Sequence, residues 1–115
     1  MDVNKIYNLD CIEYMKYLPD ECVDLIIADP PYYKIVKDDW DNQWDTVEDW
    51  IEWHEDWVSE SKRILKDTGS FYYYGGVSNI AHIKLLLDNY FEFKNWITWH
   101  KKRGYGTKRN WLFTR

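Results

Sequence analysis

The residues with the clearest chemical character form the sequence Asp29-Pro30-Pro31-Tyr32, which combines a carboxylate, two prolines and a phenol ring. Each proline fixes its own φ angle, which holds the Asp29 carboxylate and the Pro30 carbonyl in a constant mutual geometry. Two hydrogen-bond acceptors fixed in this way suit a target that carries two N–H donors. The tetrapeptide therefore predicts a site that binds an amino group.

The apolar run 23–28 explains how these groups are positioned. It is rich in Val, Leu and Ile and stops at the two prolines, as a buried parallel strand does, because proline cannot donate to a ladder. In an open α/β sheet, ligands bind at the carboxyl ends of the strands. Asp29 and Tyr32 fall at such an end, so we expect the site to lie on that edge of a sheet.

The rest of the sequence alternates strand patterns with helix patterns. We expect strands near residues 5–8, 23–28, 70–74 and 91–99. We expect helices over about 11–18, from after Thr46 to about Leu65, and after Ser78. Thr46 and Ser78 are the predicted N-caps, and Asp49 is a capping-box-like partner of Thr46. This order predicts an α/β fold with right-handed parallel crossovers.

The motif Asp29-Pro30-Pro31-Tyr32 in this position resembles the catalytic motif of the DNA amino-methyltransferases, which methylate exocyclic nitrogens of bases with S-adenosylmethionine. Upstream, the segment 8–11 (Asn-Leu-Asp-Cys) resembles the opening of these enzymes. Downstream, the segments 63–70 and 95–102 recur in the family's order. The resemblance covers essentially the whole chain, and it implies a Rossmann-like S-adenosylmethionine-dependent methyltransferase fold.

In the order of its motifs the chain resembles the subgroup of this family in which the catalytic motif comes near the N-terminus and the glycine-rich cofactor loop comes last. No Phe-x-Gly-x-Gly sequence follows a strand here, and Gly104-Tyr105-Gly106 has Arg109 where a third glycine would stand. We therefore expect residues 1–115 to be the catalytic-motif part of a methyltransferase domain. The fold would be incomplete, as the N-terminal catalytic half of the sheet without the glycine-rich loop and most of the target-recognition region.

The resemblance also implies catalytic roles for Asp29, Pro30, Pro31 and Tyr32. The target base would be flipped out of the duplex and stacked on Tyr32. Its amino hydrogens would be accepted by the Asp29 carboxylate and the Pro30 carbonyl. A leading Asp in the motif favours adenine N6 as the target, with cytosine N4 second.

The resemblance assigns binding of S-adenosylmethionine to two segments of the chain. The first holds Asp10 and Cys11, and the second holds Asp29 and Pro30. Asp10 has an alternative interpretation as the N-cap of the helix that follows it, because Glu13 stands three positions later.

The charges of the chain are segregated although its formal net charge is −5. Residues 38–60 carry acids without any Lys or Arg, whereas residues 101–115 carry bases without any acid. Because binding to phosphates requires a cationic surface, the basic segment is the predicted contact with DNA. An ordinary solvated loop is the alternative. The candidate DNA-binding residues are Lys101, Lys102, Arg103, Tyr105, Lys108 and Arg109.

Several other classes of site are not expected. The acids of residues 38–45 lack EF-hand spacing, the three histidines lack the spacing of metal ligands, and the two cysteines form no Cys-x-x-Cys pair. No apolar run approaches the ~20 residues needed to span a bilayer, and the N-terminus has no signal-peptide pattern. We expect a cytoplasmic chain with no membrane partner.

These observations predict a site-specific DNA methyltransferase, most readily of adenine N6, with this chain alone inactive. The expected partners are double-stranded DNA and a missing C-terminal portion or complementary subunit, with a homodimer as one assembly. Two alternatives stay open. The chain could be a non-catalytic module or relic that binds DNA or a partner, or its chemistry could act on RNA or on a protein amide.

Overall fold

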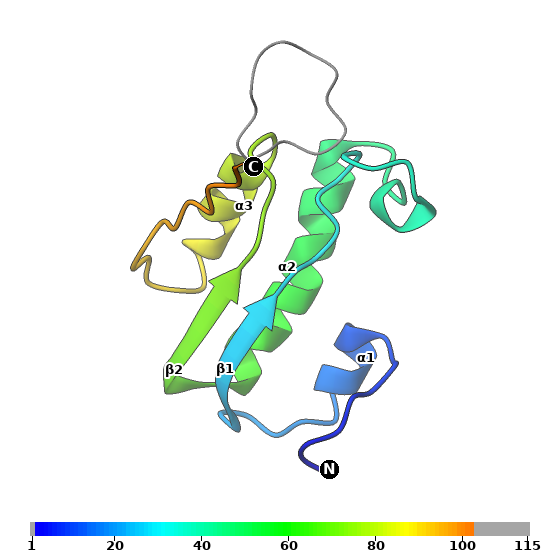
Figure 1. The fold of residues 1–115 in the computed structure, drawn as a ribbon. Helices are drawn as coiled ribbons and strands as arrows, with labels where there is room; N and C mark the ends of the chain where they lie inside the picture. The colour runs from blue at the N-terminus through cyan, green and yellow to red at the C-terminus, as the bar shows by residue number, and fades with distance from the viewer. Residues whose placement is uncertain (1, 103–115) are drawn as a thin grey trace.

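The computed structural model describes residues 2–102, which form a two-stranded sheet, three α-helices and one short 3-10 helix. In chain order the elements are α1 (Cys11–Met15), β1 (Val23–Ala28), η1 (Asp39–Asp41), α2 (Val47–Ile64), β2 (Leu65–Tyr73) and α3 (Ile80–Leu87). Figure 1 shows the long helix α2 alongside the two strands, running in the opposite direction to both. The α/β class predicted from the sequence is therefore confirmed.

The helix α2 forms because its N-terminus is capped and one of its faces is largely apolar. Thr46 is the N-cap, and its Oγ1 accepts a hydrogen bond from the backbone N–H of Asp49 at 3.1 Å, as predicted. Acids in the first turn and bases in the last turn suit the helix dipole. The buried face consists of residues three or four positions apart: Trp50, His54, Trp57, Val58, Ser61 and Ile64.

One face of the parallel β1–β2 sheet packs against α2. Phe71 and Tyr73 of β2 contact the core cluster that contains Trp57 and Leu86. The rings of Trp57 and Tyr73 are stacked, with centroids 6.3 Å apart and 8° between their planes. Burial of these large rings places the sheet on α2, since aromatic side chains remove more apolar area from water than any others.

The opposite face of the sheet is open within the described part of the chain. Alternate residues of a strand point to opposite faces, so the neighbours of the packed residues point away from α2. Leu25 and Ile27 of β1 are 50% and 63% exposed, and Tyr72, which pairs with Ile27, is 50% exposed. Apolar side chains thus line both faces of the sheet, although α2 covers only one.

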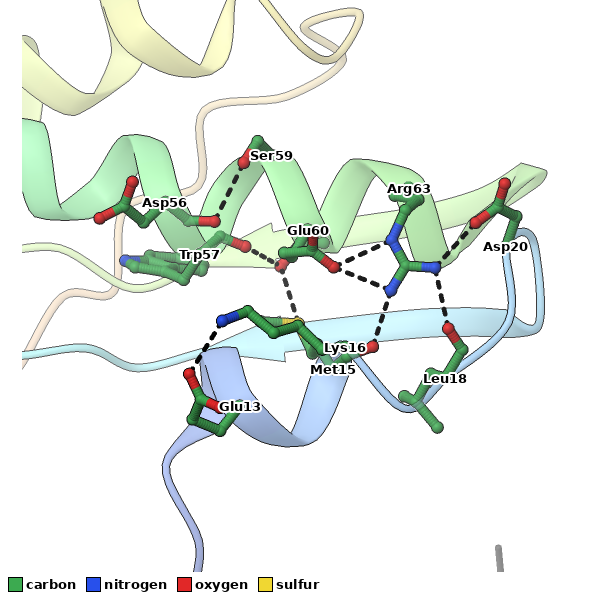
Figure 2. A network of polar contacts seen from close by, with 11 residues as sticks. Glu13, Met15, Lys16, Leu18, Asp20, Asp56, Trp57, Ser59, Glu60 and Arg63 are labelled. Carbon is green, nitrogen blue, oxygen red and sulfur yellow. Dashed lines mark hydrogen bonds and ion pairs between the residues drawn. The ribbon is translucent and has the colours of Figure 1, made fainter.

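The helix α1 is held against the C-terminal end of α2 by Arg63 (Figure 2). The guanidinium donates hydrogen bonds to the backbone carbonyls of Met15 at 2.7 Å and Leu18 at 2.8 Å. It also forms ion pairs with Asp20 and with Glu60, one turn earlier on α2. Because a guanidinium has five N–H donors in a fixed fork, this one side chain fixes both the end of α1 and the turn after it.

The bounds of the elements agree with the sequence-based prediction at some ends and differ at others. β1 has the predicted bounds, and α2 begins directly after its N-cap as predicted. The first helix ends at Met15 and not near Leu18, since Pro19 disfavours helical backbone at the residue before it. The second strand begins at Leu65 and not at residue 70, because Leu65 pairs with Val23.

Three predicted features are wrong. Residues 5–8 and 91–99 are not strands, because β1 and β2 pair only with each other within residues 2–102 and a strand needs a hydrogen-bonded neighbour. Asn79, not Ser78, is the N-cap of α3, and its side chain makes no capping bond. A complete Rossmann-like sheet has more strands than the two described, so that part of the fold stays a prediction.

No helix in the described range is long and apolar enough to cross a membrane.

The capping geometry of α2 predicts the effect of Thr46→Ala. This variant loses the acceptor for the Asp49 N–H, so we expect the free energy of unfolding to fall by about 1 kcal/mol in urea titrations followed by circular dichroism. The matched control is Ser59→Ala, an exposed hydroxyl within the helix that donates to the Asp56 carbonyl. Its effect should stay within about 0.5 kcal/mol. Equal losses in both variants would contradict the capping role.

Candidate active site

The predicted catalytic tetrapeptide follows β1 directly, at the carboxyl end of the strand. Asp29 is exposed there, and the hydroxyl of Tyr32 donates a hydrogen bond to its Oδ1 at 2.8 Å. Burial of the ring and then the hydrogen bond to Asp29 raise the pKa of Tyr32 to about 12. The phenol therefore stays protonated at neutral pH and remains a hydrogen-bond donor.

Two backbone carbonyls of the motif differ in their surroundings. The Pro31 carbonyl accepts a hydrogen bond from Nε1 of Trp50 at 3.0 Å, and that indole is 1% exposed. This bond ties the motif to the first turn of α2. No residue in the described range donates to the Pro30 carbonyl, so this oxygen can accept a hydrogen bond from a ligand. The Asp29 carboxylate and the Pro30 carbonyl are both acceptors with capacity for a ligand, and their predicted joint binding of an amino group stays a prediction.

The backbone just after the motif has an unusual conformation. Tyr33 and Lys34 have φ angles of 70° and 54°, in the left-handed region that residues other than glycine rarely adopt. The carboxylate of Asp41, which is 1% exposed, accepts hydrogen bonds from the backbone N–H groups of Tyr33, Ile35 and Val36 at 2.9, 2.6 and 3.0 Å. The Lys34 N–H donates to the backbone carbonyl of Asp41 at 2.8 Å.

A further side chain reaches the same segment from the start of α3. Nδ2 of Asn79 donates hydrogen bonds to the carbonyls of Tyr32 at 3.0 Å and Tyr33 at 3.3 Å. Sequence reasoning missed Asn79 and Trp50, and it considered Asp41 only as one of the acids of residues 38–45, which lack EF-hand spacing. No local pattern marked them, since each acts on backbone groups that only the fold brings close.

A buried polar pair lies between the site and the core. His54 is completely buried; its Nδ1 lies 2.8 Å from the Trp50 carbonyl and its Nε2 lies 3.0 Å from the Tyr73 hydroxyl. Burial lowers the pKa of His54 to about 4, against the opposing effect of its bond to the Trp50 carbonyl. His54 is therefore neutral, with Nδ1–H donating to Trp50 and Nε2 accepting from Tyr73. Burial also raises the pKa of Tyr73, which keeps that hydroxyl a donor.

The first predicted cofactor segment has a clear structural role. Oδ1 of Asp10 accepts a hydrogen bond from the Glu13 N–H at 3.0 Å, so the N-cap interpretation is confirmed. Partial burial of the thiol and then the Asp10 carboxylate raise the pKa of Cys11, which keeps it protonated. Among residues 2–102, no hydrogen bond or ring contact joins Asp10 or Cys11 to the motif at Asp29.

The predicted DNA-binding segment is only partly described. Lys101 and Lys102 are exposed, and Nζ of Lys101 lies 5.3 Å from the ring centroid of Trp99. The other four candidates, which are Arg103, Tyr105, Lys108 and Arg109, lie outside the described residues. The described range contains no group of three or more His, Cys, Asp or Glu side chains placed to hold a metal ion.

The fold and the motif together define the class of protein. A family described as "DNA methylase" matches residues 23–115. The chain is 38% identical over 114 residues to "Type II methyltransferase M.HinfI" of Haemophilus influenzae, covering 86% of this chain and 32% of that protein. It is 35% identical over 110 residues to "Type II methyltransferase M.BamHI" of Bacillus amyloliquefaciens, covering 90% and 25%.

A third relative is "DNA adenine methyltransferase YhdJ" of Escherichia coli (strain K12), 32% identical over 103 residues, with 85% of this chain and 33% of that protein covered. The chain therefore belongs to the DNA methylase family of amino-methyltransferases. It spans between 25% and 33% of the length of these three relatives.

The burial of His54 predicts a specific pH dependence of stability. Its pKa in the folded chain, about 4, lies below the ordinary value of 6.5. The stability that neutral His54 contributes is therefore complete above pH 6.5 and is lost as the pH falls toward 4. Between pH 7 and pH 5 the loss should be about 2 kcal/mol.

Urea unfolding of the wild type and of His54→Gln at these two pH values tests this expectation. In His54→Gln the free energy of unfolding should not show the decrease of about 2 kcal/mol between pH 7 and pH 5. His82→Gln, which changes an exposed histidine, should show the same decrease as the wild type. The same decrease in the wild type and in His54→Gln would show that His54 does not titrate as described.

Proposed function

We propose that this chain carries the methyl-transfer site of an enzyme that methylates the exocyclic amino group of a flipped DNA base with S-adenosylmethionine. The observation that carries the proposal is the Asp29–Tyr32 motif at the carboxyl end of β1, where Asp29 is exposed and accepts from the Tyr32 hydroxyl, and where no residue among 2–102 donates to the Pro30 carbonyl. Adenine N6 is the first choice of target, because the motif begins with Asp and one relative is named an adenine methyltransferase. Cytosine N4 is the second.

The residues at the strand end fit a sulfonium compound as the methyl donor. A sulfonium group is a cation, and the site offers the Asp29 carboxylate together with the Tyr32 ring, both of which attract cations. The donor would supply an electrophilic methyl group. Asp29 and Pro30 would bind one end of it, and Asp10 and Cys11 are the proposed contacts for its adenosyl part.

The chain's own residues prepare the nucleophile. The Asp29 carboxylate and the Pro30 carbonyl accept the two hydrogens of the amino group, which draws its lone pair out of conjugation with the ring. The nitrogen would then be held for in-line attack on the methyl carbon, so that the sulfur–carbon bond electrons return to sulfur as a neutral thioether, and the Asp29 carboxylate would take the proton that the nitrogen loses. Fixed positions of the two reactants and fixed acceptors for the developing positive charge supply the rate enhancement.

Tyr32 has a double role in this scheme. In the absence of DNA its hydroxyl binds the same carboxylate that must accept the amino group. The base therefore replaces this hydrogen bond when it enters, and the Tyr32 ring becomes a stacking surface for the base. A flipped base thus exchanges one hydrogen bond of Asp29 for another, which limits the cost of entry.

The proposal extends to the whole gene product. Its partners would be double-stranded DNA, bound through the basic segment from Lys101, and the remaining methyltransferase polypeptide, in the cytoplasm. A non-catalytic DNA-binding module is the competing function. It would bind DNA duplexes without any dependence on S-adenosylmethionine and without methyl transfer.

The role of Asp29 is tested by Asp29→Asn in the complete gene product. The amide keeps the shape of the carboxylate but loses its charge and one acceptor, so methyl transfer to duplex DNA should fall by about 100-fold or more. Incorporation of radioactive methyl groups from S-adenosylmethionine measures the rate. Asp67→Asn, at an exposed acid of β2, is the control and should transfer normally. Turnover by Asp29→Asn close to that of the wild type would rule out the proposed chemistry.

The two roles of Tyr32 predict opposite effects of two substitutions. Tyr32→Phe keeps the ring and removes the competing hydroxyl, so its KM for DNA should be no higher than that of the wild type. Tyr32→Ala loses the stacking surface, worth about 1–3 kcal/mol per base, so its binding of DNA should weaken by roughly 5- to 150-fold. Steady-state kinetics with a duplex substrate measure both, and a similar weakening in the two variants would contradict the stacking role.

A further inference from the structure

The segment 32–36, directly after the catalytic prolines, is held more completely than an exposed loop requires. Four successive backbone N–H groups, from Tyr33 to Val36, all end on Asp41. The carbonyls of Tyr32 and Tyr33 both accept from Asn79. Every one of these bonds joins the segment to a residue that is distant from the motif in sequence or belongs to another element.

The conformation that these bonds hold is one that the sequence alone disfavours. Tyr33 and Lys34 are both left-handed, and neither is a glycine or an asparagine. Such a conformation persists only where the surrounding structure over-determines it, and such residues cluster at functional sites. The buried carboxylate of Asp41 holds this conformation from one side, since its two oxygens accept hydrogen bonds from three backbone N–H groups.

Asn79 holds the same segment from the other side. It occupies the N-cap of α3, where an asparagine side chain usually binds the helix's own N–H groups, yet it makes no capping bond. Its amide points instead to the carbonyls of Tyr32 and Tyr33. The ring of Tyr32 also lies against Gly76, where an added Cβ would be 3.4 Å from Cδ2 of the ring.

We infer that Asp41 and Asn79 are positioning residues of the methyl-transfer site, which hold segment 32–36 in one conformation so that the Tyr32 ring stays beside Asp29. This inference rests on the proposed function. Neither residue touches a substrate. Both act through the backbone, and the reaction depends on them because a misplaced Tyr32 could not hold the base against the Asp29 carboxylate.

The first test is Asp41→Asn in the complete gene product. The amide nitrogen cannot accept, so in either orientation of the amide at least one of the three N–H groups loses its acceptor, and the segment is held less firmly. The kcat for methyl transfer should fall about 10- to 100-fold, while the KM for S-adenosylmethionine stays within about two-fold of the wild-type value. The matched control is Asp39→Asn, which changes an exposed neighbouring acid on η1. An unchanged kcat in Asp41→Asn would overturn the inference.

A double-mutant cycle with Lys34→Gly isolates the backbone effect. Glycine adopts positive φ without strain, so residue 34 would no longer depend on Asp41 for its conformation. The loss caused by Asp41→Asn should therefore be smaller in the Lys34→Gly background than in the wild type. An equal loss in both backgrounds would overturn the inference, because Asp41 would then act by some route other than this conformation.

Two further measurements keep the inference testable if Asp41→Asn does not fold. Asn79→Ala removes the opposite contact and no capping bond, and it should lower kcat in the same way. Amide hydrogen exchange on this 115-residue chain measures how firmly the segment is held, independently of catalysis. The N–H groups of residues 33–36 should be protected from exchange in the wild type, and either variant should lose that protection. Lost protection with normal methyl transfer overturns the positioning role, whereas a protected segment in a wild-type protein without methyltransferase activity overturns the proposed function alone.

Discussion

Burial of one face of α2 against the β1–β2 pair is the interaction on which the rest of the structure depends. Each turn of that face makes a contact with a different part of the chain. Trp50 donates to the Pro31 carbonyl of the motif, His54 reaches the Tyr73 hydroxyl at the end of β2, and the Trp57 ring stacks on the sheet. Arg63, the penultimate residue of the helix, binds the carbonyls of Met15, the last residue of α1, and of Leu18. A shift of α2 along the sheet would therefore displace the motif, the strands and α1 together.

The sequence was sufficient to predict the elements that depend on local chemistry. β1 was predicted within its bounds because an apolar run that ends at two prolines has few other structures open to it. The start of α2 was predicted because Thr46 and Asp49 carry a capping signal within four residues. The prediction failed where an element depends on a neighbour. Residues 91–99 have a strand-like composition, but no strand in the described range lies beside them to accept their hydrogen bonds.

The candidate site shows the same division. Asp29 and Tyr32 could be proposed as site residues from four adjacent residues, since the prolines make their geometry local. Asp41 and Asn79 could not, because their proposed role depends on hydrogen bonds to backbone groups, six residues away for Asp41 and Ile35 and 47 residues away for Asn79 and Tyr32, that no sequence pattern signals. Asp41 in particular stands among acids of similar appearance, and only burial separates it from them. In this chain the candidate reactive groups are adjacent in sequence, whereas the residues that hold them in place come from several elements of the fold.

The open face of the sheet links the folding of this chain to its surroundings. Leu25, Ile27 and Tyr72 remain half exposed on a surface that would release about 25 cal/mol for each Å² of apolar area removed from water. Any polypeptide that covers this face binds the folded state and not the unfolded chain, so it draws the folding equilibrium toward the native form by mass action. The apparent melting temperature of the chain is then not a constant of its sequence, and it should rise with the concentration of whatever protein surface occupies this face.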